Sequence, residues 1–460
     1  MKNVGLLCIA MLFLCGTVYA ERTVWYVHPD SALNTIQAGL DSCADNDIVL
    51  VGPGTYVENI IWPNTQGIHM ISELGPDFTV IDGDSVNRVI EISIWIDTTS
   101  LISGFTIQNG FDTLGAGIFC SAACSPTITN NNIRNNVAGF GTEPMTPWAD
   151  GIGAGICCDT ASSPVITNNT ITNNKARGHH VFGGGISCHS SAPLISNNII
   201  TGNTAQGQYW GYGGGIACMH SSPIISGNTI TLGGVGGGED CGGAGILCGS
   251  FSSPIISDNI ISFNNSDGIS CGGDSTSPII DNCTVEQNAW AGISCGGGNG
   301  VHPVIQYCDI FGQSRGIYSA FGGEPEIQNC NIFDNSYYGV DNDDAGVTVD
   351  ADSNWWGDAT GPYHPVANPG GLGNAVSDYV DFDPWLSWPV GVKEQPIVKP
   401  IEQQGSLSAT IFRGPLQLPE GKQCKVFDIT GRVVEPTKIQ PGIYFIEVDG
   451  VVTQKVVKVR

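Results

Sequence analysis

The sequence predicts an all-β fold built from stacked coils of about 23 residues, each with three short strands. Charged residues make up 13% of the chain and glycine accounts for 63 of its 460 residues, which disfavours helix-rich folds and coiled coils. With 41% hydrophobic residues, the chain has enough apolar material for a core despite its net charge of −26. A repeated unit decides the class. Successive copies of this unit start 38, 30, 30, 30, 23, 24, 24 and 23 residues apart. The first residues of the copies are Gly117, Gly155, Gly185, Gly215, Gly245, Gly268, Gly292, Gly316 and Gly339.

Each unit contains three short runs with a fixed order. They read Gly-Ile-x-Cys, then Pro-(Ile/Val/Leu)-Ile-(Ser/Thr), then (Asn/Cys)-x-Ile. Runs this short, broken by Gly, Asn, Pro and Ser, form strands rather than helices. Three small strands cannot bury an apolar face alone, so neighbouring units must stack on one another at a spacing of about 4.8 Å. We expect about eleven such coils.

Asparagine marks the turns of the repeat. Asn tolerates left-handed backbone geometry, and its amide can hydrogen-bond to the amide stacked above it. We therefore predict that these residues form ladders along the coils. One column follows the second strand and comprises Asn131, Asn169, Asn198, Asn228 and Asn259, continued by Cys283, Cys308 and Cys330. A second column closes the third strand and comprises Asn136, Asn174, Asn203, Asn264, Asn288 and Asn335.

Cysteines form an inward column next to a column of isoleucines. Cysteine is among the residue types most often fully buried, so free thiols packed in the core are the leading interpretation. Rung-to-rung disulfides are the alternative, because neighbouring rungs lie within the Cα distance that a disulfide spans. Metal binding is the third, although no Cys-x-x-Cys pair is present. The column comprises Cys120, Cys158, Cys188, Cys218, Cys248, Cys271 and Cys295.

The repeat, the asparagine ladder and the segment TIQAGLDSCADNDIVLVGPGTYVENI at 35–60 resemble the right-handed parallel β-helix superfamily, which is typified by pectate lyases and pectin esterases. The resemblance covers about residues 23–386. It implies a short capping helix starting at 35–40, a first coil formed by 48–51 and 56–60, and a closing segment at 354–386. Because this fold carries lyases, hydrolases, esterases, epimerases and non-enzymatic adhesins, it does not assign an activity.

The chain divides into five segments. Residues 1–20 predict a secretory signal peptide, since an apolar run ends in the small-residue exit Val18-Tyr19-Ala20. The N-terminal cap and first coils follow at 21–104, the repeats and closing segment at 105–386, and a Pro-containing linker at 387–405. Residues 406–460 alternate like strands separated by turns, which predicts a small C-terminal β-sandwich.

Charge excludes two classes of partner. Residues 1–392 carry 7 basic and 36 acidic side chains, a net charge of −29, whereas 393–460 carry 10 basic and 7 acidic side chains. A calculated pI near 4.3 argues against nucleic acids and anionic membrane surfaces. After the signal peptide no segment has 18 uninterrupted apolar residues, so we expect no membrane span.

The C-terminal segment carries a second resemblance. The motifs VFDITGRVV, PGIYFIEV and QKVVKVR are similar to the type A C-terminal sorting domain of the type IX secretion system. This resemblance implies the type IX machinery as a partner and a bacterial protein that is secreted or displayed on the cell surface. An immunoglobulin-like accessory domain is the alternative.

Four insertions follow the third strand of successive coils, at 136–153, 174–184, 203–214 and 232–243, and so should lie on one face. Aromatic rings beside carboxylates suit sugars, because sugar rings stack on aromatic faces while the hydroxyls bond to acids. We therefore predict that these loops bind extracellular polysaccharide. The alternative is that the aromatic rings only pack the loops together. The predicted ligand-binding residues are Trp148, His179, Phe182, Tyr209, Trp210 and Tyr212.

Polysaccharide cleavage is the rival function, and a non-catalytic adhesin or structural surface protein is the third. If the chain is a glycoside hydrolase or a lyase, the candidates on the insertions are Asp150, Glu239, Asp240 and Arg177. The resemblance implies that a lyase would need a basic residue beside a calcium-bound uronate. Between residues 110 and 384 the basic residues are Arg134, Lys175, Arg177 and Arg315.

One acidic cluster loosely matches a calcium-binding loop. Asp341, Asp343 and Asp352 are the candidate ligands, with Asp344 and Asp350 between them. The fifth position of the motif is Ala345, and residues 347–349 are typical of a strand. We expect a solvated acidic turn at this cluster, with calcium as the alternative and no other cofactor.

Overall fold

The computed structural model describes residues 22–139, 150–237 and 240–391, and in the C-terminal part 410–412, 416, 418, 424–428, 434–436, 442–448 and 451–458. The predicted signal peptide and most of the predicted linker lie outside these ranges. The chain divides into two units, Met1–Val392 and Lys393–Arg460. The boundary falls inside the linker predicted at 387–405.

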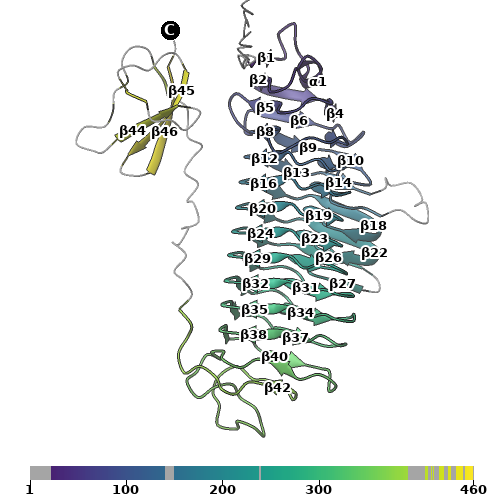
Figure 1. Ribbon diagram of the computed structural model, residues 1–460, viewed down its shortest axis with the longest axis vertical. Helices are drawn as coiled ribbons and strands as arrows, with labels where there is room; N and C mark the ends of the chain where they lie inside the picture. Colours follow the sequence, from purple (N-terminus) through teal and green to yellow (C-terminus); the bar gives the residue numbers. More distant parts are fainter. Residues whose placement is uncertain are drawn as a thin grey trace, which may run out of the picture. The chain divides into compact units, whose positions relative to one another are not determined.

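The first unit is a parallel β-helix in which the coils between its two ends contribute one strand to each of three sheets, here named faces A, B and C (Figure 1). Along the chain each coil passes from face C to face A and then to face B. Face A has 14 strands: β1 (Val24–Val27), β2 (Ile48–Val51), β5 (His69–Ser72), β8 (Leu101–Ser103), β12 (Thr127–Thr129), β16 (Val165–Thr167), β20 (Leu194–Ser196), β24 (Ile224–Ser226), β29 (Ile255–Ser257), β32 (Ile279–Asp281), β35 (Val304–Gln306), β38 (Glu326–Gln328), β41 (Val349–Asp350) and β42 (Val380–Asp381).

Faces B and C have 11 strands each, all parallel. Face B comprises β3 (Gly54–Val57), β6 (Thr79–Asp82), β9 (Thr106–Gln108), β13 (Asn132–Arg134), β17 (Thr170–Thr172), β21 (Ile199–Thr201), β25 (Thr229–Thr231), β30 (Ile260–Ser262), β33 (Thr284–Glu286), β36 (Asp309–Phe311) and β39 (Asn331–Phe333). Face C comprises β4 (Ile60–Ile61), β7 (Ile90–Ile92), β11 (Ile118–Cys120), β15 (Ile156–Cys158), β19 (Ile186–His189), β23 (Ile216–Met219), β28 (Ile246–Cys248), β31 (Ile269–Gly272), β34 (Ala291–Gly296), β37 (Arg315–Ser319) and β40 (Tyr338–Asn342).

The insertions add a fourth parallel sheet, here named the fin. It pairs corresponding segments of successive insertions in register, for example Ala176 with Ala205 and Phe182 with Tyr212. Its strands are β10 (Phe111–Asp112), β14 (Val137–Ala138), β18 (Lys175–Phe182), β22 (Thr204–Tyr212), β26 (Gly234–Gly236) and β27 (Asp240–Gly242). The sequence predicted loops at these positions, and the structure corrects this to a sheet.

Helix α1 (Ile36–Asp41) caps the N-terminal end of the coils, as the resemblance implied. The Thr35 side chain accepts a hydrogen bond from the Ala38 backbone N–H at 3.2 Å, an N-cap that satisfies one free donor of the first turn. The Glu58 carboxylate accepts two more, from the N–H groups of Ile36 at 2.8 Å and Gln37 at 3.0 Å. No described helix has the length and apolarity that a membrane span requires.

The apolar columns predicted from the repeat are confirmed. Face C pairs Ile118 with Ile156 and Cys120 with Cys158, and this register continues down the sheet. Both columns are buried, together with the central isoleucines of faces A and B. At the lower end Trp356, in the closing segment, is fully buried against the same core. The continuous core therefore depends on identical side chains meeting in register.

The asparagine ladder is present, and its hydrogen bonds join successive coils. The Asn198 side-chain oxygen accepts from the backbone N–H and the amide of Asn169, at 2.9 and 3.1 Å. The Asn198 amide donates to the Ile166 carbonyl at 2.9 Å and to the side-chain oxygen of Asn228 at 3.0 Å. Because the ladder is buried, these bonds satisfy backbone groups that water cannot reach.

The left-handed geometry lies one residue earlier than predicted. Asn130, Asn168 and Asn197 have φ values of 56, 54 and 55°, whereas the ladder asparagines that follow them do not have positive φ. The physical reason is that two successive residues have different roles in the turn. The left-handed residue turns the chain and faces solvent, so the side chain of the next residue can point inward and form hydrogen bonds along the axis of the β-helix. Gly227 takes the turning position in the next coil.

Cysteine thiols replace the asparagine amides in the lower coils. The Cys283 backbone N–H donates to the Cys308 sulfur at 3.4 Å, and the Cys308 N–H donates to the Cys330 sulfur at 3.5 Å. The Cys283 thiol donates in turn to the Ile256 carbonyl at 3.5 Å. Burial raises the pKa of Cys283 and of Cys308 well above the usual thiol value. The cysteines of the inward column and of the ladder are free thiols.

The second unit is described only in part. Its strands β43 (Thr410–Phe412), β46 (Val451–Lys458), β45 (Gly442–Val448) and β44 (Cys424–Asp428) form one mixed sheet in that order. Val426, Tyr444 and Ile446 form its small apolar cluster. The second sheet of the predicted sandwich is not among the described residues.

We predict that Asn198→Ala lowers the free energy of unfolding of the β-helix unit by about 2–3 kcal/mol, because it leaves several buried backbone groups unpaired. Asn197→Gly is the matched control. Since glycine already occupies the equivalent turn at Gly227, this change should cost less than about 0.5 kcal/mol. Denaturant unfolding followed by circular dichroism measures both, and equal losses in the two variants would contradict the ladder's role.

Thiol labelling provides the second prediction. Cys157 is buried and burial raises its thiol pKa, whereas Cys241 is exposed. Because the thiolate is the reactive species, iodoacetamide at pH 8 should label Cys241 in the folded chain and leave Cys157 and Cys283 unmodified. Peptide mass spectrometry reads out each site, and labelling in denaturant is the control. Labelling of Cys157 or Cys283 as fast in the folded chain as in denaturant would contradict the burial of these two thiols.

Candidate functional site

The fin is held by close packing of small side chains. Each insertion leaves face B after the second ladder, runs outward and returns to face C, so that two arms lie against each other. Gly211 on the returning arm approaches so closely that an added Cβ would lie 2.6 Å from the Ala205 carbonyl oxygen. Only glycine fits at this contact. The cluster between the arms comprises Ala116, Ala138, Ala154, Ala176, Val181, Ala205, Val235 and Ala244.

Four aromatic and imidazole side chains meet on strands β18 and β22, which project from the side of the coils (Figure 1). We call this group, together with Asp150, the fin cluster. The His180 ring lies 4.5 Å from Trp210 and 6.0 Å from Tyr209, and His179 meets Tyr209 edge-on at 5.4 Å. Tyr209 and Trp210 are 38% and 42% exposed. Two large rings are therefore presented to solvent on paired strands.

Asp150 anchors the fin cluster from the preceding coil. One carboxylate oxygen accepts a hydrogen bond from the His180 backbone N–H at 2.8 Å and lies 3.5 Å from the His180 Nδ1 atom. Behind these residues Phe182 stacks on Tyr212 with centroids 5.9 Å apart and an interplanar angle of 15°. The rings of this second pair pack against each other.

The structure brings together part of the predicted site. Asp240 lies one rung from Trp210. Arg177 pairs with Gln206 in the lower part of the fin, and its guanidinium lies 6.0 Å from the centre of the Phe111 ring. Trp148 and Glu239 lie outside the described residues.

Two of the three predicted calcium ligands, Asp341 and Asp343, bind other side chains. Asp341 accepts a hydrogen bond from the Arg315 Nε at 2.6 Å, and Asp343 accepts one from the Tyr318 hydroxyl at 3.4 Å. The Asp352 backbone N–H donates to Asp350 at 3.4 Å. Within the described ranges, no group of three His, Cys, Asp or Glu side chains has the geometry of a metal site.

A second aromatic group surrounds Arg315 on the outer side of face C. The Arg315 guanidinium lies 5.2 Å from the Trp290 ring, 5.6 Å from Tyr318 and 5.0 Å from Tyr337. The sequence did not predict this group, because its members come from three different coils. The spacing of Trp290, Arg315 and Tyr337 by about one coil each was the available signal.

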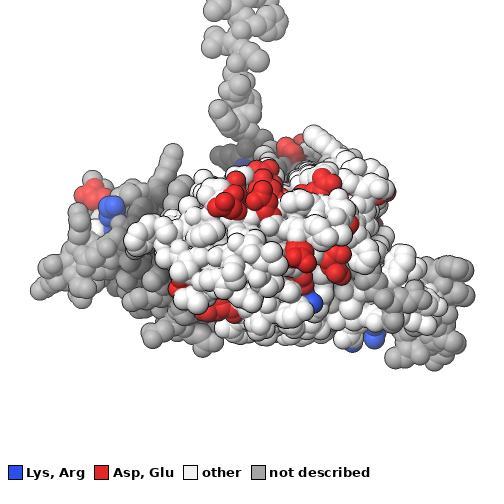
Figure 2. Space-filling model, turned by 90° about the horizontal axis from the view of Figure 1, so that it is seen from below, with Lys and Arg blue, Asp and Glu red and all other residues white. Residues whose placement is uncertain are grey.

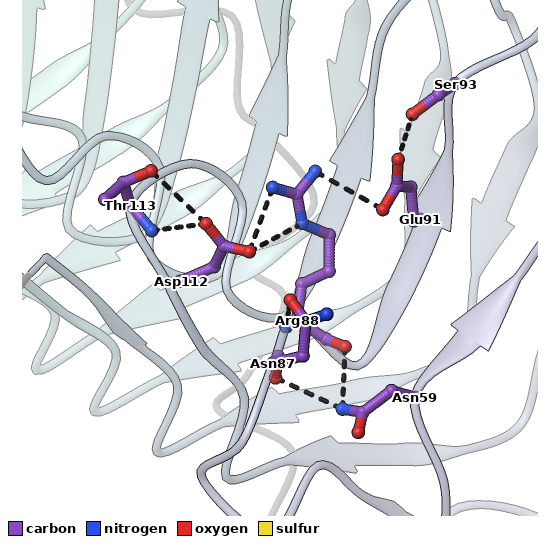
Figure 3. Close-up of polar contacts among 7 residues, drawn as sticks. All are labelled: Asn59, Asn87, Arg88, Glu91, Ser93, Asp112 and Thr113. Carbon is purple, nitrogen blue, oxygen red and sulfur yellow. Dashed lines mark hydrogen bonds and ion pairs between the residues drawn. The ribbon is translucent and has the colours of Figure 1, made fainter.

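A third group, around Arg88, was also missed because it lies before the insertions (Figure 3). The Arg88 guanidinium bonds to Asp112 at 3.0 and 3.1 Å, lies 3.7 Å from Glu91 and sits 4.3 Å from the centre of the Phe119 ring. The Ser93 hydroxyl donates to Glu91 at 2.6 Å. The Arg88 guanidinium thus contacts two carboxylates and one aromatic ring, and the Arg315 guanidinium contacts one carboxylate and three rings.

The sequence matches the family model described as right handed beta helix region at residues 26–185, 149–302 and 185–355. These matches span 26–355, which is more than half of the chain. The chain belongs to the right-handed β-helix family. The predicted fold class is therefore confirmed, including its handedness. No curated protein matches the sequence.

The solved structures that resemble this β-helix protein include three whose names describe enzymes that act on polysaccharides. The A-module of the mannuronan C-5 epimerase AlgE4 of Azotobacter vinelandii is 12% identical, with a TM-score of 0.43 over 79% of this chain and 98% of that chain. A mannuronic acid specific polysaccharide family 6 lyase from human gut microbiota is 13% identical, with a TM-score of 0.31 over 66% and 82%. Pectate lyase Pel9A is 12% identical, with a TM-score of 0.23 over 92% and 94%.

The β-helix also buries a carboxylate, Asp267, where the fin ends. Asp267 is 5% exposed, and one of its oxygens accepts a hydrogen bond from the Ser294 hydroxyl at 2.9 Å. Its other oxygen, Oδ1, has no hydrogen-bond partner among the described residues. Burial raises the pKa of Asp267 to about 6, although bonds from Ser294 and from the backbone N–H groups of Gly243 and Ala291 oppose the rise.

Asp267 therefore makes the stability of the β-helix depend on pH. Its pKa is about 6 in the folded chain and about 3.9 when unfolded. Ionisation is thus less favourable in the folded state, and stability falls as the pH rises from about 4 to about 6, by at most about 3 kcal/mol. We predict that Asp267→Asn raises the free energy of unfolding at pH 7.5 and changes it little at pH 4.

Denaturant unfolding at the two pH values measures this effect. Asp334→Asn is the control, since Asp334 is exposed and has a left-handed backbone that asparagine tolerates. It should shift the unfolding midpoint little at either pH. Equal effects of Asp267→Asn at pH 4 and pH 7.5 would show that the Asp267 carboxyl is not titrating between them.

Proposed function

We propose that this protein is a secreted or cell-surface bacterial β-helix that binds extracellular polysaccharide through the fin cluster. The observation that supports the proposal is the pair of exposed rings, Tyr209 and Trp210, beside His179 and His180. Sugar rings have apolar faces that stack on aromatic side chains, and their hydroxyls bond to imidazole and carboxylate groups. The fin cluster offers both kinds of contact at one place.

The rigidity of the fin favours binding. Strands β18 and β22 are paired in register, with one irregularity between Gly178 and His180, and small buried side chains fix their two arms. Aromatic rings on paired strands lose little conformational freedom when a ligand binds, so less of the contact energy is spent on ordering the site. Binding residues on a rigid scaffold are the common arrangement.

The charge of the protein favours a neutral polysaccharide. Residues 1–392 carry a net charge of −29, and acidic side chains form several patches on the lower end of the molecule (Figure 2). An anionic polysaccharide would be repelled by this field, most strongly at low ionic strength. We therefore propose a neutral glucan-like or mannan-like chain rather than a polyuronate.

Export is the part of the proposal that rests on sequence motifs. The signal peptide at 1–20 and the motifs VFDITGRVV and PGIYFIEV support secretion through the type IX machinery, with 406–460 as the sorting domain. The β-helix would then be released or held at the cell surface. An extracellular location agrees with a polysaccharide ligand.

Glycoside cleavage is the second candidate function. The observation that favours it is the carboxylate of Asp150, 3.5 Å from the His180 imidazole and beside the exposed rings. Such a pair can hold a proton near a bound sugar. Binding ranks first because the same carboxylate oxygen already accepts the His180 backbone N–H and so has a structural role.

We predict that Trp210→Ala weakens binding of the full chain to its polysaccharide about five- to thirtyfold, because loss of a stacking ring in a binding site costs about 1–2 kcal/mol. Affinity electrophoresis against a panel of neutral and acidic polysaccharides measures the effect. Trp95→Ala is the matched control, since Trp95 is also exposed but lies outside the fin. Unchanged retention of Trp210→Ala would refute the fin as the binding surface.

The same incubations separate binding from cleavage. If the chain only binds, no reducing ends or unsaturated uronides appear, with or without calcium. Release of either product, lost in Asp150→Asn, would make the protein an enzyme and assign the fin cluster as its active site. Retention of no polysaccharide at all would leave the structural or adhesive interpretation.

A further inference from the structure

Face A carries a line of exposed aliphatic side chains on its outer side. They occupy the first position of successive strands and lie directly above one another in the parallel register. The four central members are 36–47% exposed. Figure 1 shows these strands in one straight stack. The line, here named the aliphatic stripe, comprises Val165, Leu194, Ile224, Ile255, Ile279 and Val304.

The side chains beside the aliphatic stripe are short and uncharged. On one side lies a hydroxyl column that includes Thr167 and Ser196, which are joined by a hydrogen bond of 3.2 Å. On the other side Ala192, Ser222 and Ser253 are exposed. The first charged residue of these strands is Asp281, at the end of β32. A neutral, flat face is unusual in a unit with a net charge of −29.

We propose that the aliphatic stripe is a homodimer interface that joins two copies of this chain. A two-fold axis that lies in the plane of the interface, parallel to the strands and midway between the coils of Ile224 and Ile255, places every member opposite another aliphatic side chain. Ile224 meets Ile255 at the centre, Leu194 meets Ile279 on either side, and Val165 meets Val304 at the ends. An isologous interface requires this kind of self-complementarity.

Charge favours a second copy over other partners. A basic partner would bind the acidic patches (Figure 2) rather than this neutral face. Two copies repel each other wherever acidic surfaces meet, so they approach most easily where charges are lacking. The two-fold axis also sets Asp281 opposite the coil of Leu194 and away from its own symmetry mate, which avoids a like-charge contact.

The size of the stripe sets the strength of the dimer. Six rungs spaced by about 4.8 Å give a length of about 29 Å, and five residues across each rung give a width of about 16 Å. The dimer would bury about 900 Å² in total, which is below the roughly 1,200–2,000 Å² of stable interfaces. We therefore expect a dimer that forms at micromolar concentration and dissociates on dilution.

Sedimentation velocity of the full chain between 1 and 200 µM tests the proposal. The expected result is a concentration-dependent shift from monomer to dimer that strengthens between 0.1 and 0.5 M NaCl, because salt screens the mutual repulsion. Ile255→Lys should abolish the dimer over this range. Ile260→Lys is the matched control, because Ile260 lies in the same coil on face B and is 41% exposed, against 44% for Ile255. It should dimerise like the unmodified chain.

Other outcomes overturn the proposal. A chain that remains monomeric up to 200 µM in 0.5 M NaCl has no such interface. A dimer that survives Ile255→Lys uses a different surface, and one lost equally in both variants does not depend on face A. Circular dichroism and the thermal unfolding midpoint confirm that both variants are folded, and the result is independent of any polysaccharide.

Discussion

In-register stacking of equivalent residues is the constraint on which the rest of this protein depends. Parallel strands one coil apart satisfy each other's backbone groups, and the buried asparagine ladder satisfies those that the turns leave free. The Asn198 side chain alone bonds to both neighbouring coils, to Asn169 and Ile166 in the coil before it and to Asn228 in the coil after it. A shift of one residue in any coil would place its isoleucines in solvent. Register and core are therefore fixed together.

The ladder accepts different chemistry at the same position. Thiols of Cys283, Cys308 and Cys330 continue the column that asparagines form above, and they still accept a backbone N–H and donate to a carbonyl. These contacts are weaker than amide bonds. Burial of the thiols among apolar neighbours compensates, as expected for a residue that behaves as a small apolar side chain.

The fin shows how insertions can be added without disturbing the coils. Each insertion leaves and rejoins the helix at fixed points, and successive insertions pair with one another because the coils beneath them are already in register. The exposed Tyr209 and Trp210 are thus placed by the core, although they take no part in it. Two arginines of the β-helix, Arg88 and Arg315, are held by carboxylates and aromatic rings. The fin cluster, in contrast, presents Tyr209 and Trp210 to solvent at 38% and 42% exposure.

The sequence by itself determined the coil, the inward columns, the ladder and the position of the insertions, because each is a one-dimensional pattern repeated at the spacing of the coil. It did not determine which residue of each turn is left-handed, because Asn130 and Asn131 are the same residue type and only backbone geometry separates them. Nor did it reveal that the insertions form a sheet, because the pairing of β18 with β22 depends on packing between small side chains of successive insertions, such as Ala176 and Ala205. The groups around Arg88 and Arg315, and the raised pKa of Asp267, arise from side chains of different coils that meet only after stacking. Periodicity can be read from the order of residues in the sequence. Contacts between side chains of different coils and the burial of single charges arise only when the chain is folded.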